Sequence, residues 1–392
     1  MTRSSSASFT FILLIICTAL SLAGTDLILP AVPVLPGVFS TSEATAQMVL
    51  AAYVGGSAFG LLLFGRLADH FDRKTLMVAA LAAFAATSFA GAFAPDIYVL
   101  IGLRFLQGVA ASAAPVFAPG VIRQLFSEKT AVRAVGFLGS VESLVPALVP
   151  IAGVALLAHF GWQSSFELLG AAGAIVFVLM LLIGLPRGQR TGGTQGTYRQ
   201  LLTDPVFMRY ALSQAMTLGG LLTFVFGIPM VIVETMGGTL TDFIIVQIVS
   251  VAGFIVAANL TAKIAERFGT EEVILAGSAM AAASALALLA YGLSGGTNPL
   301  LVPVLFLPMG IGLGLRGPIG FYRGIVASGS NDARGAALIV FFVFMTTTLG
   351  TMAAAPVITM GLWALALVVS AIHFASVAIL CAFPKLTEAR SG

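Results

Sequence analysis

The sequence predicts an all-α membrane protein with twelve transmembrane helices arranged as two bundles of six. Three observations predict this class: the composition, the spacing of the apolar runs and one polar linker near the middle of the chain. The 392 residues are 59% hydrophobic and only 9% charged, with a mean hydropathy of +1.05. Soluble domains are about 45–50% apolar and about 25% charged, so the composition indicates a polytopic membrane protein.

The apolar runs divide into two groups, and each run is long enough, at about 20 residues, to cross the hydrocarbon core. The first group covers 9–36, 44–65, 75–94, 97–121, 132–158 and 163–185. The second group covers 207–234, 243–264, 272–292, 299–322, 334–358 and 361–383. We therefore expect an N-terminal six-helix bundle at 1–186, a cytoplasmic linker at 187–206 and a C-terminal six-helix bundle at 207–392.

The basic residues predict how the chain is oriented. Apart from Arg104 and Arg316, which lie within predicted spans, the 19 Lys and Arg residues lie at or beside the termini, the linker and the even-numbered connections. The positive-inside rule then places both termini in the cytoplasm. The first apolar run is too long for a signal-peptide core, so we expect an uncleaved first span in a bacterial-type cytoplasmic (inner) membrane.

A weak internal repeat supports two related halves. The segment 65–79, which begins Gly-Arg-Leu-Ala-Asp, returns as 262–276, which begins Ala-Lys-Ile-Ala-Glu, about half the chain length later. With this topology the two halves form a parallel repeat about an axis along the membrane normal. Transporters of this kind bind substrate between the halves, near the midplane.

Asp26 and Arg104 are the first candidates for proton coupling. Asp26 precedes Pro30 and Pro33 on one helical stripe, and a carboxylate within a span costs about 2.5–3.5 kcal/mol. Arg104 lies at a similar depth, and its guanidinium keeps its proton as a fixed positive charge. That charge favours an ionised carboxylate, whereas a dry cavity favours a protonated one. The alternative for Asp26 is a residue that breaks the helix or pairs with another side chain and carries no proton. The alternative for Arg104 is a structural residue that only donates hydrogen bonds to helix ends and carbonyl groups.

Glu142 is the third candidate for proton coupling, because it lies about 15 Å into the fifth span. Pro146, Pro150 and Gly153 follow on the same stripe, where small and kinking residues favour close contact and bending. Glu142 would serve as a second proton site or as a counter-charge for a cationic substrate. The alternative is an acid that is paired with a neighbouring helix for stability alone.

Four passages resemble the Major Facilitator Superfamily and, within it, the Bcr/CflA-like branch of drug:proton antiporters, which includes phenicol exporters. These passages are 65–74 (Gly-Arg-Leu-Ala-Asp-His-Phe-Asp-Arg-Lys), 25–33 (Thr-Asp-Leu-Ile-Leu-Pro-Ala-Val-Pro), 103–109 (Leu-Arg-Phe-Leu-Gln-Gly-Val) and 145–153 (Val-Pro-Ala-Leu-Val-Pro-Ile-Ala-Gly) with Gly161-Trp162 after it. His70 and Asp72 depart from the first motif, where a basic residue and a glycine are usual. The resemblance implies the major facilitator fold and identifies Pro146, Pro150 and Gly153 as an antiporter motif.

The same resemblance implies a conformational latch on the cytoplasmic side. Its residues would be Gly65, Asp69, Arg73 and Lys74. Asp69 would face the N-terminus of the eleventh span near Asn331 and Asp332, where backbone N–H groups attract anions. The alternative is that this loop acts only as an orientation signal.

Aromatic and methionine side chains are candidates for a substrate cavity, because such surfaces tolerate varied apolar ligands. The candidates are Tyr53, Phe224, Phe226, Met230, Phe341, Phe344 and Met345, together with Arg316. Each apolar candidate has a lipid-facing alternative. Arg316 would bind an anion or act in gating, or it would snorkel towards the cytoplasmic face.

The inventory of reactive residues argues against an enzyme. The histidines, His70, His159 and His373, are scattered and form neither a metal cluster nor a nucleophile–base pair. The chain has no glycine–lysine motif that would cradle a phosphate. We therefore expect no cofactor and no metal, and a proton gradient as the energy source.

Three hypotheses remain from the sequence. The first is a proton-coupled exporter of small lipophilic compounds, such as multidrug or phenicol-type antibiotic efflux by alternating access. The second is an exporter of a polar or anionic metabolite that uses the membrane arginines. The third is a receptor or scaffold without flux. The expected partners are a small-molecule substrate, protons and the lipid bilayer, with no nucleic acid, and the expected state is a monomer.

Overall fold

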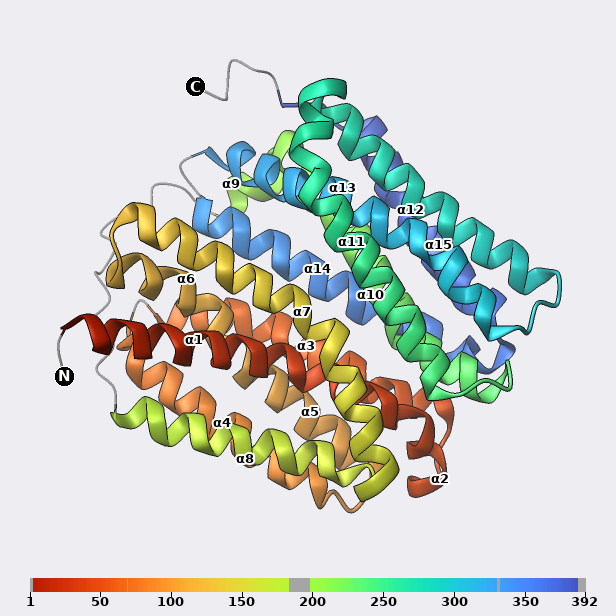
Figure 1. Cartoon of the computed structure of the whole chain (residues 1–392), viewed down its shortest axis with the longest axis horizontal. Helices are drawn as coiled ribbons and strands as arrows, with labels where there is room; N and C mark the ends of the chain where they lie inside the picture. Colours follow the sequence, from red (N-terminus) through yellow and green to blue (C-terminus); the bar gives the residue numbers. More distant parts are fainter. Residues whose placement is uncertain (1–2, 69, 183–197, 330–331, 387–392) are drawn as a thin grey trace. The chain divides into compact units, whose positions relative to one another are not determined.

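A computed structural model describes residues 3–68, 70–182, 198–329 and 332–386. Within these ranges twelve helical stretches are long and apolar enough to cross a membrane. The chain is helical along almost its whole described length and forms two compact units (Figure 1). The first unit comprises Met1–Thr41 and Ala52–Thr191, and the second comprises Ser42–Ala51 and Gly192–Gly392.

The first unit is built from the helices of the predicted N-terminal bundle. These helices are α1 (Arg3–Asp26), η1 (Leu29–Val34), α2 (Leu35–Phe39), α3 (Glu43–Leu67), α4 (Arg73–Ala92), α5 (Ile97–Ala111), α6 (Ala113–Leu125), α7 (Glu128–Phe160) and α8 (Gln163–Leu182). Helix α4 packs along α5 and α8, and α1 packs along α7 (Figure 1). The segment Ser42–Ala51, which contains the start of α3, groups with the second unit.

The second unit contains the remaining helices. These are α9 (Tyr198–Thr203), α10 (Pro205–Glu234), α11 (Leu240–Phe268), α12 (Thr270–Leu293), η2 (Pro299–Leu301), α13 (Val302–Ala327), α14 (Asp332–Ala354), η4 (Ala355–Met360) and α15 (Leu362–Ala382). Helix α13 packs between α11 and α12, and α10 packs against α14 and α15. Helix α9 falls within the predicted linker, most of which lies outside the described residues.

The first, fourth and eleventh predicted spans are not single α-helices, and the eleventh changes from α14 to the 3-10 helix η4 at Ala355. The first breaks after Asp26 and continues as the 3-10 helix η1, because Pro30 and Pro33 have no N–H to continue the ladder. The fourth breaks at Ser112, between α5 and α6. The Ser112 hydroxyl donates to the carbonyl of Val109 over 2.7 Å, which satisfies one acceptor near the end of α5.

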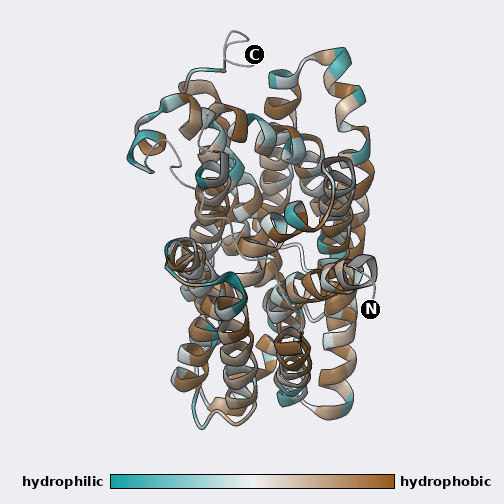
Figure 2. Cartoon of the chain, turned by 90° about the vertical axis from the view of Figure 1, so that its left-hand side faces the viewer, coloured by the Kyte–Doolittle hydropathy of each residue, from teal (hydrophilic) through white to brown (hydrophobic). Residues whose placement is uncertain are grey.

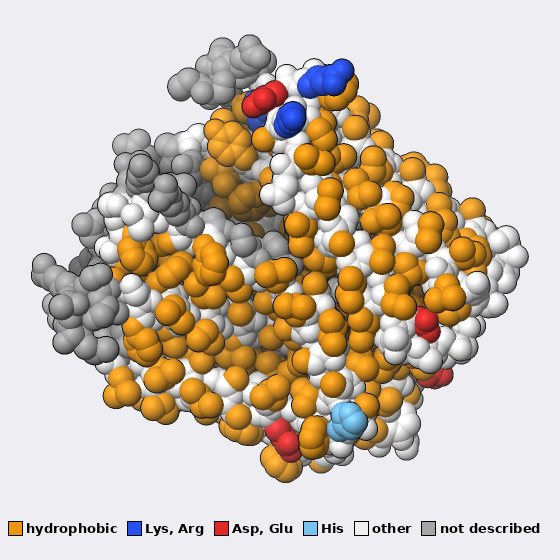
Figure 3. All heavy atoms as spheres, in the orientation of Figure 1, with side chains coloured by type: hydrophobic (Ala, Val, Ile, Leu, Met, Phe, Trp, Pro, Cys, Tyr) orange, Lys and Arg blue, Asp and Glu red, His pale blue; other side chains and the backbone are white. Residues whose placement is uncertain are grey.

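The surface is that of a protein surrounded by lipid. Most of the ribbon is hydrophobic or of intermediate hydropathy, and the strongly hydrophilic stretches are short (Figure 2). On the face drawn in Figure 3, hydrophobic side chains cover the helices, and the charged side chains that are visible lie near the edges. Such helices satisfy their backbone groups internally, as a hydrocarbon environment requires.

Candidate functional site

Arg104 of α5 is fully buried in the first unit and binds the end of α1. Its Nη1 donates to the carbonyl of Gly24 over 2.8 Å and to Gln107 Oε1 over 2.6 Å. Gln107 in turn donates through Nε2 to Ser88 Oγ of α4 over 2.7 Å. The last carbonyl groups of a helix have no intrahelical partner and carry partial negative charge, so the arginine is placed where a cation is stabilised.

Aromatic rings cover the guanidinium of Arg104. Its Cζ lies 4.1 Å from the centroid of the Tyr53 ring and 5.9 Å from that of the Phe166 ring. The Tyr53 hydroxyl donates to the carbonyl of Ser21 over 2.5 Å, again on α1. A cation held between ring faces and carbonyl groups keeps a fixed orientation, which is an arrangement that Arg favours over Lys.

Asp26 is the last residue of α1 and is only 8% exposed. Both Asp26 and Arg104 lie close enough to Tyr53 for their charges to act on its side chain. Within the part of the chain that the structure describes, no hydrogen bond or ion pair engages the Asp26 carboxylate. The described contacts are therefore not those of a carboxylate held in an ion pair, and the Asp26 carboxylate is free to take up a proton.

The predicted antiporter motif on α7 packs against the break that follows Asp26. A Cβ on Gly153 would lie 2.5 Å from the Leu27 carbonyl oxygen and 3.2 Å from Pro30 Cγ. The Leu27 carbonyl also accepts a hydrogen bond from Ser165 Oγ of α8 over 3.2 Å. Glycine at this position therefore lets α7 approach the irregular backbone of the first span.

Glu142 is half-buried on α7. Among the described residues, no basic side chain lies within ion-pair distance of its carboxylate. The described contacts therefore give no support to the alternative in which Glu142 forms an ion pair with a neighbouring helix. Pro146 is half-buried and Pro150 is buried within the same helix.

The predicted latch is only partly described. Asp69 and Asn331 lie outside the described residues, and the Asp332 side chain is not described either. Lys74 donates through Nζ to the Leu181 carbonyl at the end of α8 over 2.9 Å, and Asp72 accepts from the Lys74 N–H as the N-cap of α4. The departure at Asp72 is therefore explained by helix capping.

Arg316 of α13 is fully buried in the second unit. Its Nη1 donates to the Ser213 carbonyl over 2.7 Å and its Nη2 to Ser213 Oγ over 3.1 Å. Snorkelling towards the cytoplasmic face is therefore wrong for this side chain, because the guanidinium binds α10 inside the bundle. In each unit an arginine of the fourth span thus donates to a carbonyl of the first span of that unit.

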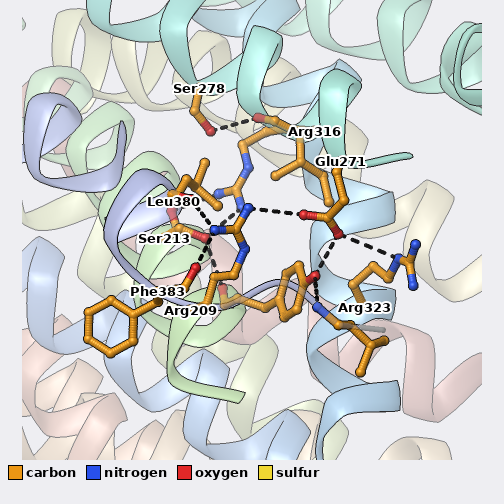
Figure 4. A network of polar contacts seen from close by, with 11 residues as sticks. Arg209, Ser213, Glu271, Ser278, Arg316, Arg323, Leu380 and Phe383 are labelled. Carbon is orange, nitrogen blue, oxygen red and sulfur yellow. Dashed lines mark hydrogen bonds and ion pairs between the residues drawn. The ribbon is translucent and has the colours of Figure 1, made fainter. Parts of the chain in front are cut away.

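A charged network lies beside Arg316 (Figure 4). Arg209 of α10 forms a 3.0 Å ion pair with Glu271 of α12 and donates to the Leu380 and Phe383 carbonyl groups at the end of α15. Tyr210 donates to Glu271 Oε1 over 2.5 Å, and Arg323 lies 3.8 Å from the same carboxylate. Sequence reasoning missed Arg209, which lies close to the start of α10 beside the polar linker.

The predicted substrate-binding residues occupy different environments. Tyr53, Phe224, Phe226 and Met230 are buried, so none of these four faces lipid. Phe224 stacks on Phe306 with ring centroids 4.5 Å apart. The half-buried candidates are Phe341, Phe344 and Met345. Their role in substrate binding stays a prediction.

Among the described residues, His, Cys, Asp and Glu side chains form no group of three or more that could hold a metal ion. The sequence profile of the Major Facilitator Superfamily matches residues 14–355. The predicted superfamily, the twelve-span all-α fold class and the assignment to a transporter family and not to an enzyme family are confirmed by this match. The family as a whole handles small molecules in a membrane.

Two curated relatives have names that refer to drug resistance, in keeping with the predicted branch. The multidrug resistance protein MdtL of Salmonella heidelberg (strain SL476) is 28% identical over 228 residues, which cover 57% of this chain and 58% of the relative. A chloramphenicol resistance protein of Pseudomonas aeruginosa is 29% identical over 272 residues, which cover 68% of this chain and 64% of the relative. The chain therefore spans less than two thirds of the length of these relatives.

Two solved structures share the fold. A D-xylose-proton symporter superposes with a TM-score of 0.72 at 15% identity. The superposition covers 96% of this chain and 98% of the symporter chain. A bacterial homologue of the human lysosomal transporter Spinster also has a TM-score of 0.72 at 15% identity, covering 96% and 95%. Together with the bacterial relatives, the twelve apolar helices indicate a multi-pass protein of the inner membrane.

Proposed function

The chain belongs to the Major Facilitator Superfamily, and from this premise we propose that it is a proton-coupled exporter of small lipophilic compounds. The proposed substrates are of the multidrug or phenicol type, because two relatives are named for resistance to such compounds. In this proposal the two bundles rock to expose the substrate alternately to each side of the membrane.

One observation carries the coupling mechanism. Asp26 lies at the break of α1, unpaired by any described side chain, and two residues after the carbonyl that binds the Arg104 guanidinium. A carboxylate beside a fixed cation ionises more readily when water reaches it, and it takes up a proton when water leaves. Exposure to alternate sides would then tie the protonation of Asp26 to the conformation of the bundles.

Glu142 is proposed as an assisting acid. It is half-buried and lacks a described basic partner, so its charge is available for a proton or for a cationic group of the substrate. We further propose that both termini lie in the cytoplasm, as the distribution of basic residues suggests. We also propose that the protein works as a monomer. The boundaries of its two bundles and linker are proposed at 1–186, 187–206 and 207–392.

The test is gradient-driven transport of chloramphenicol in proteoliposomes with an imposed pH gradient. Asp26→Asn should abolish gradient-driven transport and retain substrate exchange at zero gradient, because exchange needs no net proton movement. Glu234→Gln is a matched control, since Glu234 is exposed at the end of α10. Full gradient-driven transport by Asp26→Asn would refute the coupling role.

An exporter of polar or anionic metabolites is the second candidate. It is favoured by Arg316, a buried guanidinium that forms no ion pair with any described carboxylate. Competition by cationic, neutral and anionic compounds in the same proteoliposomes separates the candidates. Competition by anions alone would support the second, and absence of any flux would instead support a receptor or scaffold.

A further inference from the structure

A column of buried polar residues lies within the second unit. On α15, Ser370, His373 and Ser376 recur every three residues and are all buried, with His373 at 0% exposure. This spacing places them along one face of the helix. An ionisable side chain buried at membrane depth is costly and marks a functional site more often than not.

The column continues across to α10 through hydrogen bonds. Ser376 Oγ donates to the Ser213 carbonyl over 3.0 Å and forms a 2.8 Å hydrogen bond with Thr217 Oγ1. The same Ser213 carbonyl accepts from Arg316. The helix that carries His373 is thus joined to the buried guanidinium through one shared acceptor, and the charge of Arg316 acts on His373.

Several polar atoms of this column have no partner among the described protein atoms. They are both ring nitrogens of His373, Ser370 Oγ, Gln214 Oε1 and Arg316 Nε. A buried donor or acceptor without a partner costs about 1–3 kcal/mol. Lipid around the unit offers no compensating hydrogen bond, so these atoms need a ligand from inside the bundle.

Two glycines make room for the polar atoms. A Cβ on Gly220 of α10 would lie 2.9 Å from His373 Nε2. A Cβ on Gly320 of α13 would lie 2.9 Å from Arg316 Nη2 and 3.2 Å from Gln214 Oε1. A Cβ at Gly220 would require the buried imidazole to shift, and a Cβ at Gly320 would require the Arg316 and Gln214 side chains to give way.

We propose that the column formed by Gln214, Arg316, Ser370 and His373 is an internal water-binding site of the second unit. A neutral imidazole offers one donor and one acceptor, the amide oxygen accepts and Arg316 Nε donates. Water matches all of them, and buried water commonly makes about three hydrogen bonds to such groups. The fixed charge of Arg316 would exclude cations from the site.

The site would hold water inside the second unit, in a different unit from Asp26. Gly220, which faces the imidazole, lies in the middle part of the 30-residue helix α10. Water at this depth would keep His373 and Gln214 solvated without a direct protein partner. This inference concerns the second unit alone and holds whatever the transported substrate is.

Hydroxyl-radical footprinting of the full-length protein in ¹⁸O-labelled water tests the proposal, because radicals made from bound water label side chains that bulk solvent does not reach. His373 should be labelled several-fold above Phe306, an equally buried residue of the same unit that stacks on Phe224. Labelling of His373 at or below the level of Phe306 overturns the proposal.

Two substitutions of His373 give an independent test, because a hydrated and a dry site predict changes of the Tm in opposite directions. In a hydrated site, His373→Leu strands the remaining polar atoms and should lower the Tm by about 2–4 °C. In a dry site it removes two unpaired polar atoms and should raise the Tm, which would also overturn the proposal. His373→Gln keeps one donor and one acceptor group and should stay closer to the parent Tm than His373→Leu. A larger fall for His373→Gln than for His373→Leu contradicts hydration.

Discussion

Arg104 on α5 donates a 2.8 Å hydrogen bond to the carbonyl oxygen of Gly24 on α1, two residues before the carboxylate of Asp26. The bond fixes a permanent cation at the end of a helix that stops inside the membrane. Because Gln107 and the Tyr53 ring hold the same guanidinium, its place depends on three elements of the first unit. The substitutions below separate the charge from the geometry.

Replacing Arg104 by Lys keeps the charge and removes the planar group that stacks on Tyr53. We expect Arg104→Lys to fold and to lose most gradient-driven transport, because a lysine ammonium is a point charge without the guanidinium plane. Transport in proteoliposomes and the Tm in detergent measure the two effects. Arg66→Lys is the control, since Arg66 is exposed at the end of α3. Wild-type transport by Arg104→Lys would show that charge alone suffices.

Gly24→Ala should destabilise the first unit by about 1–3 kcal/mol, because the new Cβ would overlap the Tyr53 hydroxyl. Tyr53→Phe removes that hydroxyl and should recover part of the loss in the double variant. Thermal unfolding of the four proteins gives the coupling energy. Gly102→Ala is the control, because nothing lies within 4 Å of a Cβ there. Equal Tm values for Gly24→Ala and Gly102→Ala would contradict the predicted overlap.

Gly153→Ala should reduce transport by separating α7 from the break of the first span. The added Cβ would lie 2.5 Å from the Leu27 carbonyl oxygen, so the two backbones must move apart. Initial transport rates measure the effect, and Gly37→Ala on α2, where a Cβ meets nothing within 4 Å, is the control. Unchanged transport and Tm for Gly153→Ala would show that this close approach has no functional weight.

Glu271→Ala should destabilise the second unit by about 3 kcal/mol, because it leaves the buried Arg209 guanidinium without its counter-charge. Glu272→Ala removes an exposed acid at the next position and should change stability by no more than about 0.5 kcal/mol. Denaturant or thermal unfolding of the two variants gives the comparison. A similar small effect for both would mean that Arg209 is stabilised by the carbonyl groups of α15 alone.

The twelve spans were predictable because lipid demands long apolar runs, and the run lengths alone carry that signal. The break of the first span was signalled by Pro30 and Pro33, which cannot donate to the helix ladder. The break at Ser112 has a similar mark in Pro115, which has no N–H to continue the helix ladder, although we predicted a continuous fourth span.

The candidate site was predicted in part. The motifs located Asp26 and Arg104, yet counting residues at 1.5 Å each placed Arg316 near a surface, whereas the structure buries it against Ser213. Arg209 and Glu271 are 62 residues apart, and no local pattern predicts that contact. Pairings between distant helices depend on helix rotation, which one sequence does not specify.

The end of α15 is tied to the charged network of the second unit, since Arg209 Nη1 donates to the Phe383 carbonyl over 2.8 Å and the Leu386 N–H donates to the Tyr210 hydroxyl over 3.1 Å. Expression plasmids that truncate the chain ahead of Leu386, or splice a fluorescent reporter there, would therefore remove an anchor of Tyr210. A purification tag belongs beyond this residue, where it leaves that anchor in place.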